Sequence, residues 1–185
     1  DSLWLAAEVQ RTTGVETIPH VTPRDASLMG LQAQLLGAWR GGLRNLLAIT
    51  GDPSQLGDYP GRHDVYHVDI FELVRALSRL NEGFDCAGNP VGEPPAFCIG
   101  VAVNPSADNL DHEIDRLRRK VDAGAHFAMS QVFFAWEPWL RLQIEHPDNY
   151  QHAEKIVDDE FVVPRMRQRP QIKVGVMGHP RKASA

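Results

Sequence analysis

Residues 46–61, LLAITGDPSQLGDYPG, begin with an apolar strand and continue into a polar loop, a pattern that the rest of the chain repeats. The apolar run that ends at Ile49 is typical of a buried strand. The strand stops at Thr50, and the next three residues are Gly51, Asp52 and Pro53. Because glycine and proline disfavour a helix here, the sequence predicts a carboxylate held in a loop at the end of a buried strand. Such a position is suited to a residue that takes part in a reaction.

Buried strands and amphipathic helices alternate over most of the chain. The predicted strands are 15–22, 43–50, 96–104, 126–134 and 172–178. Apolar residues at a spacing near 3.6 predict helices at 2–12, 26–39, 70–80, 110–122 and 136–144. We expect a short extended piece at 65–69 and a long loop rich in Gly, Pro and Asn at 81–95, which is either functional or an insertion.

The alternation of apolar strands with helices predicts an α/β fold with a parallel sheet covered by helices. Two architectures fit this pattern, an open doubly wound sheet and a (β/α) barrel. The chain has about five predicted strands, whereas a full barrel needs eight strands and roughly 250 residues. Periodicity alone leaves open the choice between an open sheet and part of a barrel.

The composition excludes several classes of protein. The chain has 185 residues and a net charge of −5, with Lys and Arg spread along it, so it offers no basic face to nucleic acid or an anionic membrane. Its longest apolar runs are strand-sized, too short for a membrane span. Cys86 and Cys98 fit neither a zinc motif nor a disulfide scaffold, which favours reduced thiols and a cytoplasmic location. The first residues lack both a signal peptide and an initiating Met, and we expect a fragment of a longer protein.

In both architectures ligands bind at the C-terminal ends of the strands. The polar or flexible residues expected there are His20, Thr22, Thr50, Gly51, Asp52, Asn104, Gln131, Gly178 and His179. Several strands that bring polar groups to one mouth indicate a site better than any single residue does. Taken alone, His20 is explained as well by a bond to a neighbouring backbone group, and Asp52 by a turn in which Asp bonds its own backbone.

Two further residues have alternative interpretations. Gln131 interrupts an apolar strand, and a buried amide needs partners from the protein or from a ligand. Lys120 lies near the end of a predicted helix and is most simply a surface charge that complements the helix dipole. The glycine-rich motifs of dinucleotide and phosphate loops are absent, as is the nucleophile elbow of hydrolases.

Four segments of the sequence together resemble the methylenetetrahydrofolate reductase family. They are IPHVTPRD, TGDPSQLGDYPG, GNPVGEPPAFCIGVAVNP and RRKVDAGAHFAMSQVFF. GDYPG and GNPVGEPP are typical of the bacterial branch often fused to a homocysteine methyltransferase domain. The resemblance implies a (β/α)₈ TIM barrel, of which residues 1–185 form a single incomplete domain with the third to about the seventh strand.

The resemblance also implies an activity. The family uses NADH or NADPH to reduce FAD, which lies across the strand tips, and the reduced flavin converts 5,10-methylenetetrahydrofolate to 5-methyltetrahydrofolate. It therefore implies FAD, a nicotinamide reductant and a folate substrate, in one-carbon and methionine metabolism. As partners it implies a homo-oligomer or a fused methyltransferase domain, and neither nucleic acid nor a membrane.

The family's functional positions can be placed on this sequence one at a time. The implied cofactor-binding residues are His20, Thr22, Thr50, Gly51, Asp52, Asn104, Glu113 and Lys120. Among them, Glu113 and Lys120 reach the ribityl or phosphate part of FAD, with Lys120 as the natural phosphate partner. Asp52 and Gln131 are the implied catalytic and folate-binding residues, since Asp52 adjusts the electrostatics of hydride transfer and Gln131 hydrogen-bonds folate.

The sequence departs from the family pattern in ways that matter for activity. The family's general acid is a glutamate on the first strand, which this chain does not contain; Glu8 falls in a helix and Glu16 at the wrong end of a strand. Without that acid we expect hydride transfer to slow by about 10²–10⁴-fold. Residues 145–170 match poorly, and His179 and Pro180 replace the usual family residues. The alternative is therefore a truncated, non-catalytic homologue that keeps a flavin-binding platform or only the fold.

Overall fold

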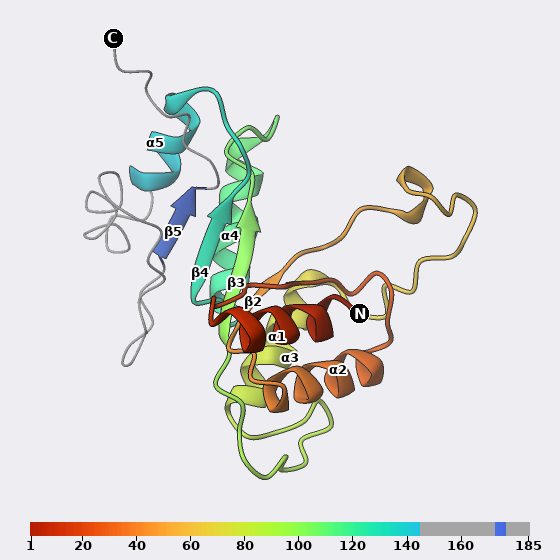
Figure 1. Cartoon of the computed structure of the whole chain (residues 1–185). Coiled ribbons are helices and arrows are strands. Elements are labelled where there is room, and N and C mark those ends of the chain that lie inside the picture. Colours follow the sequence, from red (N-terminus) through yellow and green to blue (C-terminus); the bar gives the residue numbers. More distant parts are fainter. Residues whose placement is uncertain (145–172, 177–185) are drawn as a thin grey trace.

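Helices and strands alternate along the chain in the computed structural model, which describes residues 1–144 and 173–176 (Figure 1). The helices are α1 (Ser2–Thr13), α2 (Leu28–Arg40), α3 (Ile70–Asn81), α4 (Leu110–Asp122) and α5 (Trp136–Ile144), with a short 3₁₀ helix η1 (Ser54–Leu56). The strands are β1 (His20–Val21), β2 (Asn45–Ala48), β3 (Cys98–Val103), β4 (Phe127–Ser130) and β5 (Lys173–Val176). None of the described helices is long and apolar enough to cross a membrane.

The strands form one parallel sheet in the order β1-β2-β3-β4-β5, which is also their order in the sequence. A doubly wound sheet reverses its strand order at a switch point, and this sheet does not. Neighbours that advance one strand at a time, each followed by a helix, are the arrangement of a (β/α) barrel. The strand order therefore decides between the two architectures in favour of part of a barrel.

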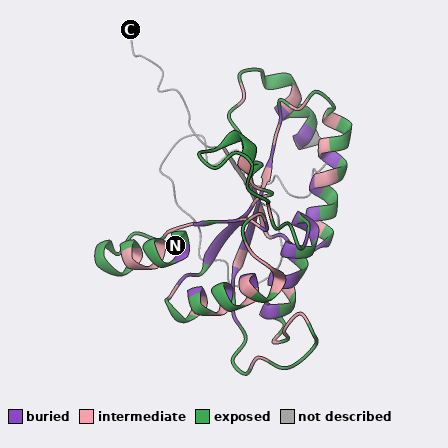
Figure 2. Cartoon of the chain, turned by 90° about the vertical axis from the view of Figure 1, so that its right-hand side faces the viewer, coloured by how far each residue is buried: buried purple, intermediate pink, exposed green. Residues whose placement is uncertain are grey.

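The helices bury the stripes that the sequence predicts. Eight of these side chains are at most 3% exposed: Leu31 and Leu35 in α2; Leu73, Val74, Leu77 and Leu80 in α3; and Ile114 and Leu117 in α4. Figure 2 shows these buried faces turned toward the sheet. Ser27 caps α2 by accepting a hydrogen bond from the Gly30 N–H, and the nearby Asp25 pairs with Arg24.

The strands predicted at 15–22, 43–50, 96–104 and 126–134 are all shorter than expected, and the first and last of these differences bear on the site. The strand predicted at 15–22 is paired only at His20–Val21, because β2 lies beside the chain only there; Val15 and Glu16 are exposed. β4 ends at Ser130, so the prediction that Gln131 is a buried amide inside this strand is wrong. The Gln131 N–H still bonds the Val103 carbonyl, but its side chain is exposed at the strand tip.

Other expectations concern loops and the end of the chain. No strand forms at 65–69, where Asp69 instead caps α3 in a capping box with Glu72. The loop predicted at 81–95 begins one residue later, after α3 ends at Asn81, and residues 82–95 contain only an isolated bridge between Phe84 and Pro90. It lies at the N-terminal ends of the strands, opposite the strand tips (Figure 1). In barrels that end serves stability rather than chemistry. Residues 145–170 and the candidates Gly178 and His179 lie outside the described residues.

Candidate functional site at the strand tips

The register of the sheet brings three of the predicted site residues to one face. His20, Leu47, Gly100 and Phe127 are aligned across the first four strands. Because side chains alternate along a strand, Asn104 and Gln131, just beyond β3 and β4, continue on the same face as His20. His20 and Gln131 are exposed and Asn104 is half-buried. The inner face of the sheet therefore carries polar groups at its C-terminal edge.

Hydrogen bonds tie the tip of β1 to the tip of β2. The Thr22 hydroxyl donates to the Thr50 carbonyl at 2.8 Å and accepts from the Arg24 N–H at 3.1 Å. The Arg24 guanidinium reaches the same segment and donates to the Asp52 carbonyl at 3.0 Å. The backbone of residues 50–52 is thus held in place by side chains of the β1–α2 loop.

Gly51 is required at the point where these two tips meet. Its φ is 82°, and a Cβ atom added there would overlap the Thr22 hydroxyl. The Gly51 carbonyl accepts a 3.0 Å hydrogen bond from the Tyr66 hydroxyl, which comes from the far end of the β2–α3 loop. Desolvation, followed by the nearby Asp64 carboxylate, raises the pKa of Tyr66. Only glycine satisfies both the backbone angle and the close approach.

The carboxylate of Asp52 is exposed and does not form the turn that its position beside Pro53 allows. An Asp in such a turn accepts a hydrogen bond from the N–H two residues on. Here that donor, the Ser54 N–H, goes instead to both carboxylate oxygens of Asp64, each at 3.2 Å. The interpretation of Asp52 as a turn residue is therefore wrong, and its carboxylate faces solvent at the tip of β2.

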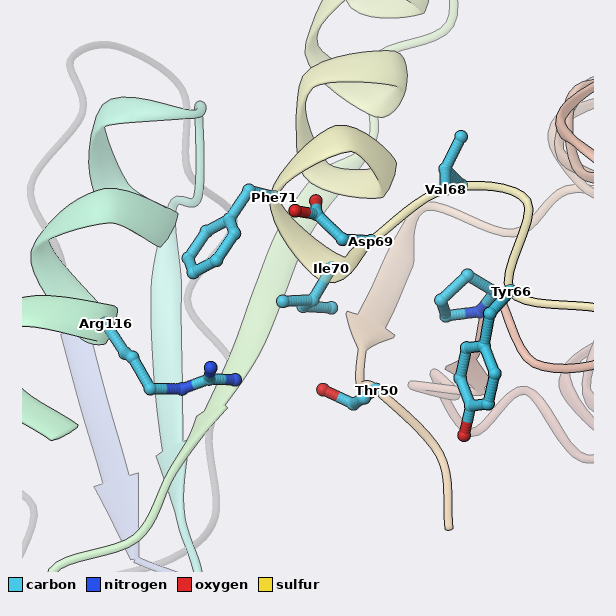
Figure 3. A pocket seen from close by; sticks show the side chains of 8 residues that line it. Thr50, Tyr66, Val68, Asp69, Ile70, Phe71 and Arg116 are labelled. Atoms are coloured by element: carbon cyan, nitrogen blue, oxygen red, sulfur yellow. The ribbon is translucent and has the colours of Figure 1, made fainter. Parts of the chain in front are cut away.

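A cavity of about 280 Å³ lies beside this tip, between the β2–α3 loop, the start of α3 and α4. Its lining residues are Pro23, Thr50, Tyr66, Val68, Asp69, Ile70, Phe71 and Arg116. Figure 3 shows the Arg116 guanidinium and the Thr50 hydroxyl on facing sides of it. The sequence does not single out Arg116, which is one of four basic residues in RLRRK, and its half-buried position in the fold distinguishes it from the exposed Arg118 and Arg119.

Glu113 and Lys120 both reach the tip of β3 from α4. Glu113 accepts a 3.0 Å hydrogen bond from the Asn104 N–H, and its second oxygen lies 3.7 Å from Nε of Arg116. Lys120 is only 5% exposed, so its interpretation as a surface charge is wrong. Its ammonium donates to the Ala102 carbonyl at 2.6 Å. Burial lowers the pKa of Lys120, and the charge of Glu113 partly opposes this shift.

The two glutamates nearest the N-terminus lie away from the strand tips, as the sequence predicts. Glu8 is on α1, where it forms an ion pair with Arg11, and Glu16 precedes β1 at the opposite end of the strand. Neither carboxylate joins the polar groups around Asp52.

Comparison with known proteins agrees with this geometry. A family model described as methylenetetrahydrofolate reductase matches residues 1–168. The chain belongs to the methylenetetrahydrofolate reductase family. The family fold is a TIM barrel, so the consecutive parallel strands described above are part of such a barrel.

Curated relatives carry the same name over much of this chain. The 5,10-methylenetetrahydrofolate reductase of Pectobacterium carotovorum subsp. carotovorum is 32% identical over 139 residues, which cover 73% of this chain and 40% of the relative. The Escherichia coli (strain K12) enzyme of the same name is 30% identical over 135 residues, which cover 73% of this chain and 40% of the relative. Methylenetetrahydrofolate reductase 1 of Schizosaccharomyces pombe is 31% identical over 132 residues, which cover 68% of this chain and 19% of the relative. The chain thus spans two-fifths or less of these reductases.

Proposed function

We propose that this chain binds FAD across its strand tips and uses NADH or NADPH to reduce 5,10-methylenetetrahydrofolate to 5-methyltetrahydrofolate. The names of its relatives support the folate reaction. The observation that carries the proposal is the Asp52 carboxylate, exposed at the tip of β2 on a backbone that Thr22 and Arg24 hold in place. We place the reaction in one-carbon and methionine metabolism in the cytoplasm.

The residues at the tips suit a flavin nucleotide. A flavin needs a flat surface for its rings, and the side-chain-free Gly51 allows the rings to approach the backbone. Its phosphates need a cation, and the Arg116 guanidinium that lines the cavity can bind phosphate through two parallel hydrogen bonds. His20, Thr22, Thr50 and Asn104 lie at the tips of β1, β2 and β3, so we assign them to the cofactor site together with Gly51 and Asp52.

The bound flavin would supply the chemistry that the side chains lack, by accepting hydride from the nicotinamide and passing it to the folate. Asp52 would place a fixed negative charge beside both reactants, which favours cationic character in the folate. Gln131, exposed one residue beyond β4, offers an amide that can both donate to and accept from a pterin. The chain's own contribution is thus orientation and electrostatics.

A second candidate function is a flavin-binding platform that does not reduce folate. The positions of Glu8 and Glu16 favour it, because neither can deliver a proton at the strand tips. General acid catalysis by such a group contributes about 10²–10⁴-fold in rate. On this reading the chain takes hydride from a nicotinamide but transfers it poorly.

One experiment separates the two functions. The purified chain is loaded with FAD and given NADH or NADPH without oxygen, and methylenetetrahydrofolate is then added. Bleaching of the flavin followed by its return on adding folate is the result expected of the reductase. Bleaching without return supports the platform. A chain that retains no flavin contradicts both proposals.

A further inference from the structure

The segment that leaves the tip of β4 toward α5 exposes large apolar side chains (Figure 1). Phe134 is 97% exposed, and Val132, two residues before it, is 57% exposed. Trp136 and Leu140 on α5 are also exposed. A single exposed apolar residue needs no explanation, whereas several gathered in one short segment indicate a binding surface.

A ring between the two exposed residues anchors the segment to α5. Phe133 stacks on Trp139, with 5.2 Å between the ring centroids and 10° between the ring planes. It also meets Trp136 edge-on, at 5.7 Å and 77°. Trp139 is 5% exposed, so the anchor belongs to the core. Outside a helix, neighbouring side chains point to different sides, so Phe133 packed on α5 turns Val132 and Phe134 away from that helix.

The segment begins at the amide that we assign to the pterin. The Gln131 N–H donates to the Val103 carbonyl at 2.8 Å, which fixes the start of the segment beside the end of β3. Phe134 follows three residues later, so its Cα atom lies at most about 11 Å from that of Gln131. Phe134 is therefore held within a short distance of the strand tips.

A folate presents two ring systems in a row, and each needs a different partner. The pterin has polar edges, which suit the donor and acceptor of an amide. The p-aminobenzoate ring that follows it has two apolar faces, which suit an aromatic side chain. The distance from Gln131 to Phe134 is within the length of these two linked rings. One segment of the chain thus offers an amide for the first ring and an aromatic face for the second.

We propose that Phe134 binds the p-aminobenzoate ring of the folate, with Val132 extending the apolar surface. This rests on the proposed function, in which Gln131 binds the pterin. Contact between the two rings would remove apolar surface of both from water. Phe134 has no group that can move a proton or a hydride, so its role is to bind the substrate. The site should therefore favour pterins that carry a benzoate ring over pterins that lack one.

Two ligands that differ by this ring test the proposal. Pteroic acid carries the pterin and the p-aminobenzoate ring, and pterin-6-carboxylate ends before the ring; each has one carboxylate. Their affinities for the chain saturated with FAD are measured by calorimetry. We expect Phe134→Ala to lose roughly tenfold in affinity for pteroic acid and to bind pterin-6-carboxylate like the wild type. An equal loss for both ligands, or no loss for either, would overturn the proposal.

Matched variants show whether the ring itself is responsible. Phe134→Tyr keeps the aromatic face and should keep the affinity for pteroic acid; a loss as large as that of Phe134→Ala would contradict the proposal. Trp4→Ala removes another exposed aromatic side chain, on α1, and should change neither affinity. Because Phe134 is exposed, Phe134→Ala should unfold at the same temperature as the wild type, so that a loss of affinity reports on binding.

The wild type alone separates this inference from the proposed function. A wild-type chain that binds neither ligand would contradict the proposed folate site, and this inference with it. A wild-type chain that binds both ligands equally well would contradict only the contact between Phe134 and the benzoate ring.

Discussion

The hydroxyl of Thr22 donates a 2.8 Å hydrogen bond to the carbonyl of Thr50, and this bond joins the tip of β1 to the tip of β2. The two residues are 28 positions apart in the sequence. The bond fixes the backbone from which the Asp52 carboxylate projects. The position of the candidate catalytic group thus depends on a side chain from the neighbouring strand.

Removal of this hydroxyl should weaken both the fold and the site. In Thr22→Val the Thr50 carbonyl loses its donor, and we expect the free energy of unfolding to fall by about 1 kcal/mol. Urea unfolding measures this change. Thr22→Ser keeps the hydroxyl and serves as the matched control, so a Thr22→Ser variant as unstable as Thr22→Val would show that the methyl group matters and the bond does not.

Asp52→Asn should separate flavin binding from folate reduction. The side chain is exposed, and its neighbours bond the Asp52 backbone, so the amide should leave FAD affinity nearly unchanged. The lost negative charge should slow flavin reoxidation by methylenetetrahydrofolate, by about 10-fold or more. Stopped-flow absorbance follows that step. Equal rates in wild type and variant would refute the electrostatic role of Asp52.

His126 should make the fold less stable in mild acid. Its Nδ1 accepts a hydrogen bond from the Ile99 N–H at 3.0 Å, which requires the neutral ring, and burial lowers its pKa from 6.5. Below pH 6.5 the unfolded chain therefore binds the proton more readily than the folded chain, and the free energy of unfolding falls until the pH passes the folded pKa.

The control for this prediction is His126→Asn, whose side-chain oxygen can accept from the same N–H without titrating. Urea unfolding of both proteins is measured between about pH 8 and about pH 5. The wild type should lose more stability than the variant across that range. Parallel pH profiles would mean that His126 keeps its proton affinity on folding.

Two glycine-to-alanine changes should have opposite effects on stability. A Cβ atom at Gly100 in β3 would overlap the ring of Phe127 on β4, and overpacking of this kind costs about 1–3 kcal/mol. At Gly37, exposed in α2, a Cβ atom meets nothing within 4 Å, and alanine should stabilise the helix by about 0.5–1 kcal/mol. Thermal unfolding of both variants checks the signs. A stabilising Gly100→Ala would mean that the ring moves freely.

The sequence predicts most of the fold because its strongest signals are periodic. The stripe from Ile70 to Leu80 predicts α3 within one residue of its observed end at Asn81. The sequence alone leaves the order of the strands open, because a parallel sheet of either architecture has the same apolar runs. The family resemblance predicts the barrel, and the consecutive pairing agrees with it.

The site was harder to predict, because its details depend on contacts between distant segments. Taken alone, Asp52 is explained by a turn as well as by a site, but Asp64, ten residues beyond Ser54, takes the hydrogen bond that such a turn needs. Lys120 resembles a surface charge until α4 packs against β3 and buries it. Arg116 differs from its basic neighbours only by the cavity that it lines. Local patterns contain none of this information.

Hydrogen exchange of the intact chain with and without FAD tests most directly whether the strand tips form the flavin site. We expect FAD to slow exchange of backbone amides in residues 20–24 and 49–53 and at Asn104. Exchange in the 81–95 loop, at the opposite end of the strands, should not change. Protection of that loop, or no protection at the strand tips under saturating FAD, would contradict a flavin site at the strand tips.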